Sequence, residues 1–176
     1  MKQFVKLQMS DLQKVVTFYN TIIDDSKESP YSPGWTKNIY PDKKLLSQLI
    51  AEKSMYGLKS FDEIFAAICL NNSCELESKK VNWNVNASEN EVWFIHLLGV
   101  SKAEQGKGFG KKLIYEAENI AIKSGKKVLR LEVNERNLPA IKLYENTGFM
   151  YVDTVKIHYP STGFIFLKLY QKNLIQ

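Results

Sequence analysis

A strongly apolar stretch, residues 91–100 (EVWFIHLLGV), precedes the segment AEQGKGFGKKLI, residues 103–114, which holds three glycines and three lysines. The apolar stretch is typical of a buried strand, and apolar residues from Phe109 to Ala121 recur with the spacing of one helix face. The glycines therefore lie between a strand and a helix, where the first backbone N–H groups of the helix lack partners. Glycine lets such a backbone approach a ligand closely. This junction predicts a phosphate-binding helix N-terminus; the alternative is a flexible glycine turn.

Two common phosphate-binding motifs do not fit this junction. A P-loop would require a glycine at Gln105 and a serine or threonine at Lys112. The dinucleotide-binding fingerprint would require a glycine at Lys111. Spacing alone therefore leaves the kind of phosphate ligand open.

The positive charge of the chain is concentrated near the same junction. The formal net charge is +5, and residues 102–127 contain seven lysines against three glutamates. The sequence has no long Lys/Arg run and no repeat of aromatic and basic residues, so we expect a small polyanionic ligand and no nucleic acid.

Length and composition suggest one domain over residues 1–176. No apolar run is long enough to span a bilayer, and the first residues lack the apolar segment of a signal peptide. Two cysteines, Cys69 and Cys74, are too few for a disulfide framework. We therefore expect a cytoplasmic protein with reduced thiols and no membrane partner.

The rest of the chain alternates between strand and helix patterns. The expected elements are a strand at 3–8, a helix from an N-cap at Ser10 to about Ile23, a helix at 42–53, strands at 54–60 and 63–72, a polar loop at 71–90, the strand at 91–100, a helix closed by Gly125, a strand at 127–133, a helix at 138–147, and strands at 149–158 and 163–171. This order predicts a mixed α/β fold rather than a doubly wound repeat.

Two motifs carry a resemblance to a known family. Gln105-x-x-Gly108-x-Gly110 resembles the acetyl-CoA motif Q/R-x-x-G-x-G/A of the GNAT superfamily of N-acetyltransferases. Downstream, NLPAIKLYENTGF, residues 137–149, is similar to that family's N-x-x-A-x-x-L-Y-x-x-x-G-F. The resemblance implies a central, mostly antiparallel sheet in which strands 91–100 and 128–133 splay apart, flanked by about four helices. It also implies transfer of an acetyl group from acetyl-CoA to an amine of a small molecule (an amino acid, polyamine or amino sugar) or of a peptide.

The resemblance also implies a set of positions that bind acetyl-CoA. Backbone groups of Leu98 and Val100 would pair with the pantetheine arm, and the Val100 N–H would polarise the thioester carbonyl. Asn137 would bond to the same arm, and Lys142 would add positive charge near the nucleotide phosphates. The pyrophosphate would be held by backbone N–H groups of Gln105, Gly106, Lys107, Gly108, Phe109, Gly110 and Lys111. The sequence contains no cluster of metal ligands, so no metal is expected.

Acid and base candidates follow from the same comparison. Tyr144 occupies the family's general-acid position, and a phenol can donate a proton to a departing thiolate; the alternative is a core tyrosine. His96 is the base candidate, because imidazole accepts a proton near neutral pH; the alternative is a buried structural histidine. Simple strand alternation would place Phe94, His96 and Leu98 on one face of the strand.

The acceptor is less defined by the sequence. Trp35, Tyr31 and His158 are expected to contact it, and Tyr40 is expected to lie near it. Glu132 is expected to be a surface charge. Cys69 has no neighbour that would activate it, so direct transfer is favoured over an acetyl-cysteine route. The alternative function is a CoA-binding regulatory domain without turnover. Family members are often homodimers, although no residue here requires one.

Overall fold

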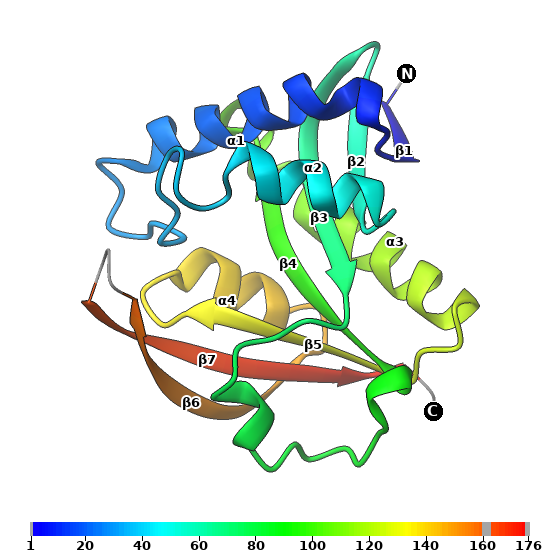
Figure 1. The fold of residues 1–176 in the computed structure, drawn as a ribbon, viewed down its shortest axis with the longest axis vertical. Helices are drawn as coiled ribbons and strands as arrows, with labels where there is room; N and C mark the ends of the chain where they lie inside the picture. Colours follow the sequence, from blue (N-terminus) through cyan, green and yellow to red (C-terminus); the bar gives the residue numbers. More distant parts are fainter. Residues whose placement is uncertain (1, 160–162, 175–176) are drawn as a thin grey trace.

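The computed structural model describes residues 2–159 and 163–174 of the chain. Along these residues the α-helices and strands (Figure 1) are β1 (Lys2–Lys6), α1 (Leu12–Ser26), α2 (Lys43–Ala51), β2 (Met55–Ser60), β3 (Glu63–Asn71), β4 (Val92–Val100), α3 (Phe109–Lys123), β5 (Val128–Asn134), α4 (Leu138–Glu145), β6 (Met150–Tyr159) and β7 (Gly163–Asn173). The order of elements is the one that the sequence predicts.

The strands form one sheet in the order β1-β2-β3-β4-β5-β7-β6. Only β4 and β5 are parallel neighbours, and every other pair is antiparallel. Parallel neighbours need a crossover connection, which α3 provides here. The mixed, mostly antiparallel sheet confirms the expected fold class.

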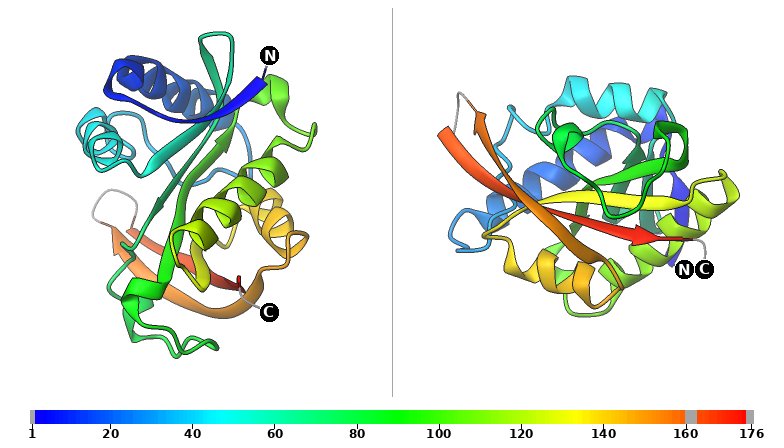
Figure 2. Two further views of the ribbon diagram at one scale, coloured as in Figure 1. Left: turned by 90° about the vertical axis from the view of Figure 1, so that its right-hand side faces the viewer. Right: turned by 90° about the horizontal axis from the view of Figure 1, so that it is seen from below.

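The helices cover both faces of this sheet. In the left view of Figure 2, α1 and α2 lie on one side of the sheet and α3 and α4 on the other. β3 connects the two cores: Ile68 packs in the core with α3, while Ala67 and Cys69 pack in the core with α1 and α2. A strand that is covered on both faces must be apolar at successive positions, which explains the continuous apolar stretch of β3.

β4 and β5 separate along their length. They pair only where Val92–Ile95 faces Val128–Leu131. Beyond this point β4 remains paired with β3 as far as Val100, and β5 remains paired with β7 as far as Asn134. The two strands therefore diverge, and their facing backbone edges are left without each other as partners.

A β-bulge in β4 contradicts the simple alternation that we expected for this strand. Leu97 has a φ of +52°, and the register of β4 against β3 shifts next to it. Such a bulge places one extra residue on the strand and reverses the direction of the side chains that follow. Leu97 consequently packs in the core with α1 and α2, whereas Leu98 packs in the core with α3. Leu98 and His96 are therefore not on the same face.

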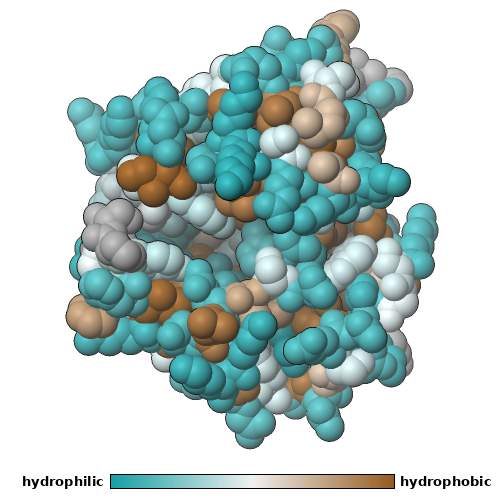
Figure 3. All heavy atoms as spheres, viewed as in Figure 1, coloured by the Kyte–Doolittle hydropathy of each residue, from teal (hydrophilic) through white to brown (hydrophobic). Residues whose placement is uncertain are grey.

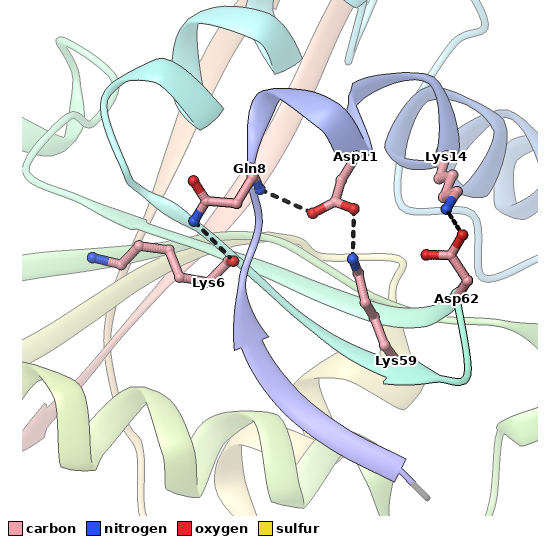
Figure 4. A network of polar contacts seen from close by, with 6 residues as sticks. All are labelled: Lys6, Gln8, Asp11, Lys14, Lys59 and Asp62. Atoms are coloured by element: carbon pink, nitrogen blue, oxygen red, sulfur yellow. Dashed lines mark hydrogen bonds and ion pairs between the residues drawn. The ribbon is translucent and has the colours of Figure 1, made fainter.

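The start of α1 also differs from the expectation. Ser10 lies within a short 3-10 turn, Met9–Asp11, and Asp11 rather than Ser10 is the N-cap residue of α1. The Asp11 carboxylate accepts a hydrogen bond from the Gln8 backbone N–H and pairs with Lys59 on β2, while Lys14 pairs with Asp62 (Figure 4). The Asp11 carboxylate thus provides a partner for both the Gln8 N–H and the Lys59 ammonium group, and these bonds stabilise the 3-10 turn that precedes α1.

Candidate active site

The junction between β4 and α3 is an exposed turn whose backbone requires glycine. Gly106 and Gly108 have φ values of +76° and +84°, in the left-handed region that disfavours side chains. A Cβ at either position would meet no atom within 4 Å, so open space lies beside the backbone. The Gln105 side chain donates from Nε2 to the Val100 carbonyl oxygen at 3.0 Å, which ties this turn to the end of β4.

The first turn of α3 presents hydrogen-bond donors to this open space. The Lys112 backbone N–H donates to the Gly108 carbonyl oxygen at 3.0 Å, which is the first hydrogen bond of the helix. The preceding N–H groups have no carbonyl within the helix to bond to. Lys107 lies beside them, 3.4 Å from a Glu104 carboxylate oxygen, and Lys111 is exposed. Free N–H groups, the positive end of the helix dipole and two lysines fit the pyrophosphate of acetyl-CoA.

Gly110 serves packing rather than ligand approach. A Cβ at this position would lie 2.9 Å from Cδ2 of Leu143 on α4, so a larger residue would require the Leu143 side chain to shift. Phe109 is anchored next to it by an edge-to-face contact with Phe65, with ring centroids 5.0 Å apart.

The end of β4 directs backbone groups towards the space that β5 leaves. Ser101 donates its N–H to the Phe65 carbonyl oxygen of β3 at 2.8 Å. In an antiparallel pair the neighbouring position is not hydrogen-bonded, so the N–H and C=O of Val100 point away from β3. Of these two backbone groups, the Val100 carbonyl already accepts a hydrogen bond from Gln105, so the Val100 N–H is the one that remains available.

The residues from the second motif surround α4. The Asn137 side-chain oxygen accepts a hydrogen bond from the Ala140 N–H at 3.3 Å and so caps the helix, which leaves its amide N–H groups to donate elsewhere. Lys142 is exposed. Tyr144 is buried in the core with α3, in edge-to-face contact with Phe149, and burial raises the pKa of its phenol. Within the described chain, no hydrogen bond engages the Tyr144 hydroxyl.

A cavity of about 240 Å³ lies on the other face of the sheet, against α2. Figure 3 shows a hollow on the side viewed in Figure 1, between the part of the molecule that holds α1 and α2 and the part that holds β6 and β7. The pairing of β4 with β5 ends at Ile95 and Leu131. His96 and Glu132 are the next residue of each strand, and both line the cavity. The divergence of the strands thus brings an imidazole and a carboxylate to one site.

His96 has the properties of a neutral base. Its Nε2 lies 2.9 Å from the Ser73 carbonyl oxygen, and because a carbonyl only accepts, Nε2 must carry the proton. In the neutral ring Nδ1 then has a free lone pair. Burial lowers the pKa of His96 below its usual 6.5, although the hydrogen bond to Ser73 opposes this shift. The ring is therefore neutral at pH 7.

Glu132 is half-buried and is not the surface charge that we expected. Its Oε1 accepts a hydrogen bond from the Glu75 backbone N–H at 3.0 Å, and burial raises the pKa of its carboxyl group. Tyr40 and Cys69 also line the cavity, and burial raises the pKa of each to about 12. Both are therefore protonated at neutral pH, and the Cys69 thiol is a poor nucleophile.

The three residues expected at the acceptor lie outside this cavity. Trp35 packs beside Tyr19 in the core with α1 and α2, with ring centroids 5.5 Å apart. Tyr31 is exposed in the loop between α1 and α2. The exposed His158 ring near the end of β6 lies tilted against the Phe164 ring, with ring centroids 4.8 Å apart. Residues 160–162, which follow β6 in the sequence, lie outside the described residues.

Two cavity residues were missed as functional candidates, although each left a signal in the sequence. Glu132 is a polar residue within the alternating strand KVLRLEV, on the side opposite to buried Leu131 and Val133. Glu75 lies in a polar loop that carries no motif, and only the folded chain brings it beside Glu132.

Two features are absent from the described part of the chain. No group of three or more His, Cys, Asp or Glu side chains in residues 2–159 and 163–174 could hold a metal ion. No helix in the same part of the chain is long and apolar enough to cross a membrane.

Comparison with known proteins matches both sequence and fold. An uncharacterised N-acetyltransferase of Methanocaldococcus jannaschii is 34% identical over 90 residues, which cover 47% of this chain and 40% of that protein. The N-alpha-acetyltransferase RimI of Mycobacterium tuberculosis is 36% identical over 69 residues, 39% of this chain and 42% of RimI. The matched region thus spans about two fifths of each curated relative.

Solved structures share the fold over almost the whole chain. The structure of yncA from Salmonella typhimurium with its cofactor acetyl-CoA has a TM-score of 0.74 at 14% identity, covering 100% of this chain and 95% of that one. An N-acetyltransferase from Staphylococcus aureus has a TM-score of 0.74 at 13% identity, covering 99% of both chains. The profile of the Acetyltransferase (GNAT) family matches residues 20–149, more than half of the sequence. The chain therefore belongs to the GNAT acetyltransferase family.

Proposed function

We propose that this protein is an acetyl-CoA-dependent N-acetyltransferase that transfers acetyl directly to an amine of a small molecule or peptide. The observation that carries the proposal is the divergence of β4 from β5, with the glycine junction at one end and titratable groups on both faces. Acetyl-CoA supplies an activated acyl thioester, and a thiol leaves when the amine takes the acyl group. Family membership and the acetyl-CoA complex of yncA support this reading.

The chain offers groups for each part of the acetyl-CoA molecule. Backbone N–H groups of residues 106–111, with Lys107 and Lys111, would hold the pyrophosphate. The Gln105 N–H, which the sequence also suggested, already donates to the Ser101 carbonyl oxygen at 3.1 Å and is not free for a ligand. The free edge of β4 at Leu98 and Val100 would bind the pantetheine arm. The Val100 N–H is a donor for the thioester carbonyl oxygen.

Further side chains complete the proposed site. The Asn137 amide would add a donor to the pantetheine arm, and Lys142 would add positive charge near the nucleotide. Trp35, Tyr31 and His158 remain proposed acceptor contacts, and Tyr40 and Glu132, which line the cavity, are added to them.

Proton transfer is assigned to groups on opposite faces of the sheet. The acceptor amine must lose a proton, and the free lone pair on Nδ1 of His96 can accept it, on the face covered by α2. The departing thiolate must gain a proton, and Tyr144 holds one on the face covered by α3 and α4. The protonated, buried thiol of Cys69 supports direct transfer without an acyl-cysteine step.

A thiol-release assay with acetyl-CoA and a panel of amines tests the proposal, with calorimetric titration of acetyl-CoA alongside it. We expect micromolar-range binding typical of enzyme substrates and turnover on one class of amine. Binding without turnover on any amine would favour a CoA-binding regulatory domain. Absence of binding would refute the assignment of the glycine junction.

A further inference from the structure

The cavity at the divergence of β4 and β5 is acidic. Glu75 and Glu132 line it, and among the described residues neither a lysine nor an arginine does. Its tyrosine and cysteine groups are protonated and therefore neutral at pH 7. A ligand that enters meets negative charge together with neutral hydrogen-bonding groups.

The two carboxylates are held near each other without a countercharge. Glu132 accepts the backbone N–H of Glu75, and the Glu75 side chain accepts a hydrogen bond from the Tyr159 hydroxyl. Neither forms an ion pair with a described residue. Burial, with the Glu75 charge as a smaller contribution, raises the pKa of Glu132. A cationic ligand would remove this repulsion and become the missing counterion.

The position of Glu132 places such a cation where transfer is proposed. Glu132 directly follows the last residue of β5 that pairs with β4, and His96 occupies the equivalent position on β4. Both side chains line the same cavity. A cation bound by Glu132 therefore lies at the divergence of the two strands, on the face that carries the base candidate.

We infer that Glu132 binds the ammonium group of the acceptor, and that the acceptor is a primary amine with no carboxylate on the carbon that carries the amine. The inference rests on the proposed function, because it assigns the acceptor of that reaction. An α-amino acid would bring a third negative charge beside Glu75 and Glu132, which repel it. Alkylamines, arylalkylamines and diamines bring only positive charge.

Three probes that share one side chain separate charge from size: phenethylamine, phenylalanine and phenylalanine amide. We expect kcat/KM for phenethylamine to exceed that for phenylalanine by at least about tenfold. The amide, which lacks the negative charge but has almost the size of phenylalanine, should be accepted like phenethylamine.

Matched variants test the role of Glu132 itself. Glu132→Gln should lower kcat/KM for phenethylamine by at least about tenfold, mainly through KM, and should erase the preference over phenylalanine. Glu132→Asp keeps the charge and should restore part of the preference. Glu77→Gln is the control, because Glu77 contributes to the raised pKa of Glu132 but does not line the cavity. It should retain both the affinity and the preference.

A binding measurement separates this inference from the proposed function. Calorimetric binding of phenethylamine to the protein in the presence of CoA should weaken in Glu132→Gln to the same extent as kcat/KM. The inference is overturned if phenylalanine is used as well as phenethylamine, if no probe binds, or if Glu77→Gln behaves like Glu132→Gln. Failure of the wild-type protein to bind acetyl-CoA would instead overturn the proposed function.

Discussion

Replacement of Gly108 by alanine tests the glycine junction most directly. Gly108 has φ +84° and ψ +4°, and an L-residue in this region costs roughly 1–2 kcal/mol. For a chain of this length we expect the melting temperature to fall by roughly 2–8 °C. The methyl group would also occupy the open space beside the N–H groups of α3. Loss of one hydrogen bond to a charged phosphate costs roughly 1.5–3 kcal/mol, so Kd for acetyl-CoA should rise at least about tenfold.

The other end of α3 provides the matched control for this change. Gly125 has φ +72°, and a Cβ there also meets nothing within 4 Å. Gly125→Ala should therefore lower the melting temperature by a similar amount and leave Kd unchanged. Calorimetric titration of acetyl-CoA into both variants, with a thermal melt of each, gives the comparison. Equal Kd values for the two variants would refute a ligand role for this backbone.

Three further changes address the acid, the base and the core. Tyr144→Phe should lower kcat by roughly 10²-fold with little change in melting temperature, because the hydroxyl bonds to no described residue; full turnover in stopped-flow thiol release would exclude Tyr144 as the acid. The proposed base is the neutral form of His96, whose pKa burial lowers from its usual 6.5, so kcat/KM should stay high at pH 6.5 and fall at lower pH, as the imidazole becomes protonated. In His96→Gln this acidic limb should be absent, and its persistence would show that the histidine is structural. Leu129 is fully buried on β5, so Leu129→Ala should lower the free energy of unfolding by roughly 2–5 kcal/mol in urea denaturation, and a loss under about 1 kcal/mol would contradict its packing.

Local sequence patterns predicted the elements of this fold well. Apolar spacing placed the helices and strands, because side chains repeat every 3.6 residues on a helix face and every two on a strand. The glycines of the β4–α3 junction were also recognisable from the sequence, because a positive φ next to a helix start is a local property of the backbone that favours glycine. The start of α1 was missed because the carboxylate of Asp11 pairs with Lys59, which is distant in the sequence.

The residues of the acceptor side could not be predicted in this way. Simple alternation failed in β4, because the bulge at Leu97 depends on how β4 pairs with β3 rather than on its own residues. Glu132 has the local pattern of a surface charge, because its partner, the backbone N–H of Glu75, lies in a loop that is distant in the sequence. Aromatic residues in the loop after α1 suggested Trp35, Tyr31 and Tyr40, but the sequence could not show that of these three Tyr40 lines the cavity.

The sequence by itself determined the order of the elements, the glycine junction and the two motifs of the family, all of which are encoded by residues close together in the chain. Only the tertiary structure decided where β4 and β5 part, which side chains meet there, and that the cavity is acidic. Those features arise from pairing between strands that are distant in the sequence, and a shift of one residue in such pairing moves a side chain to the opposite face of the sheet.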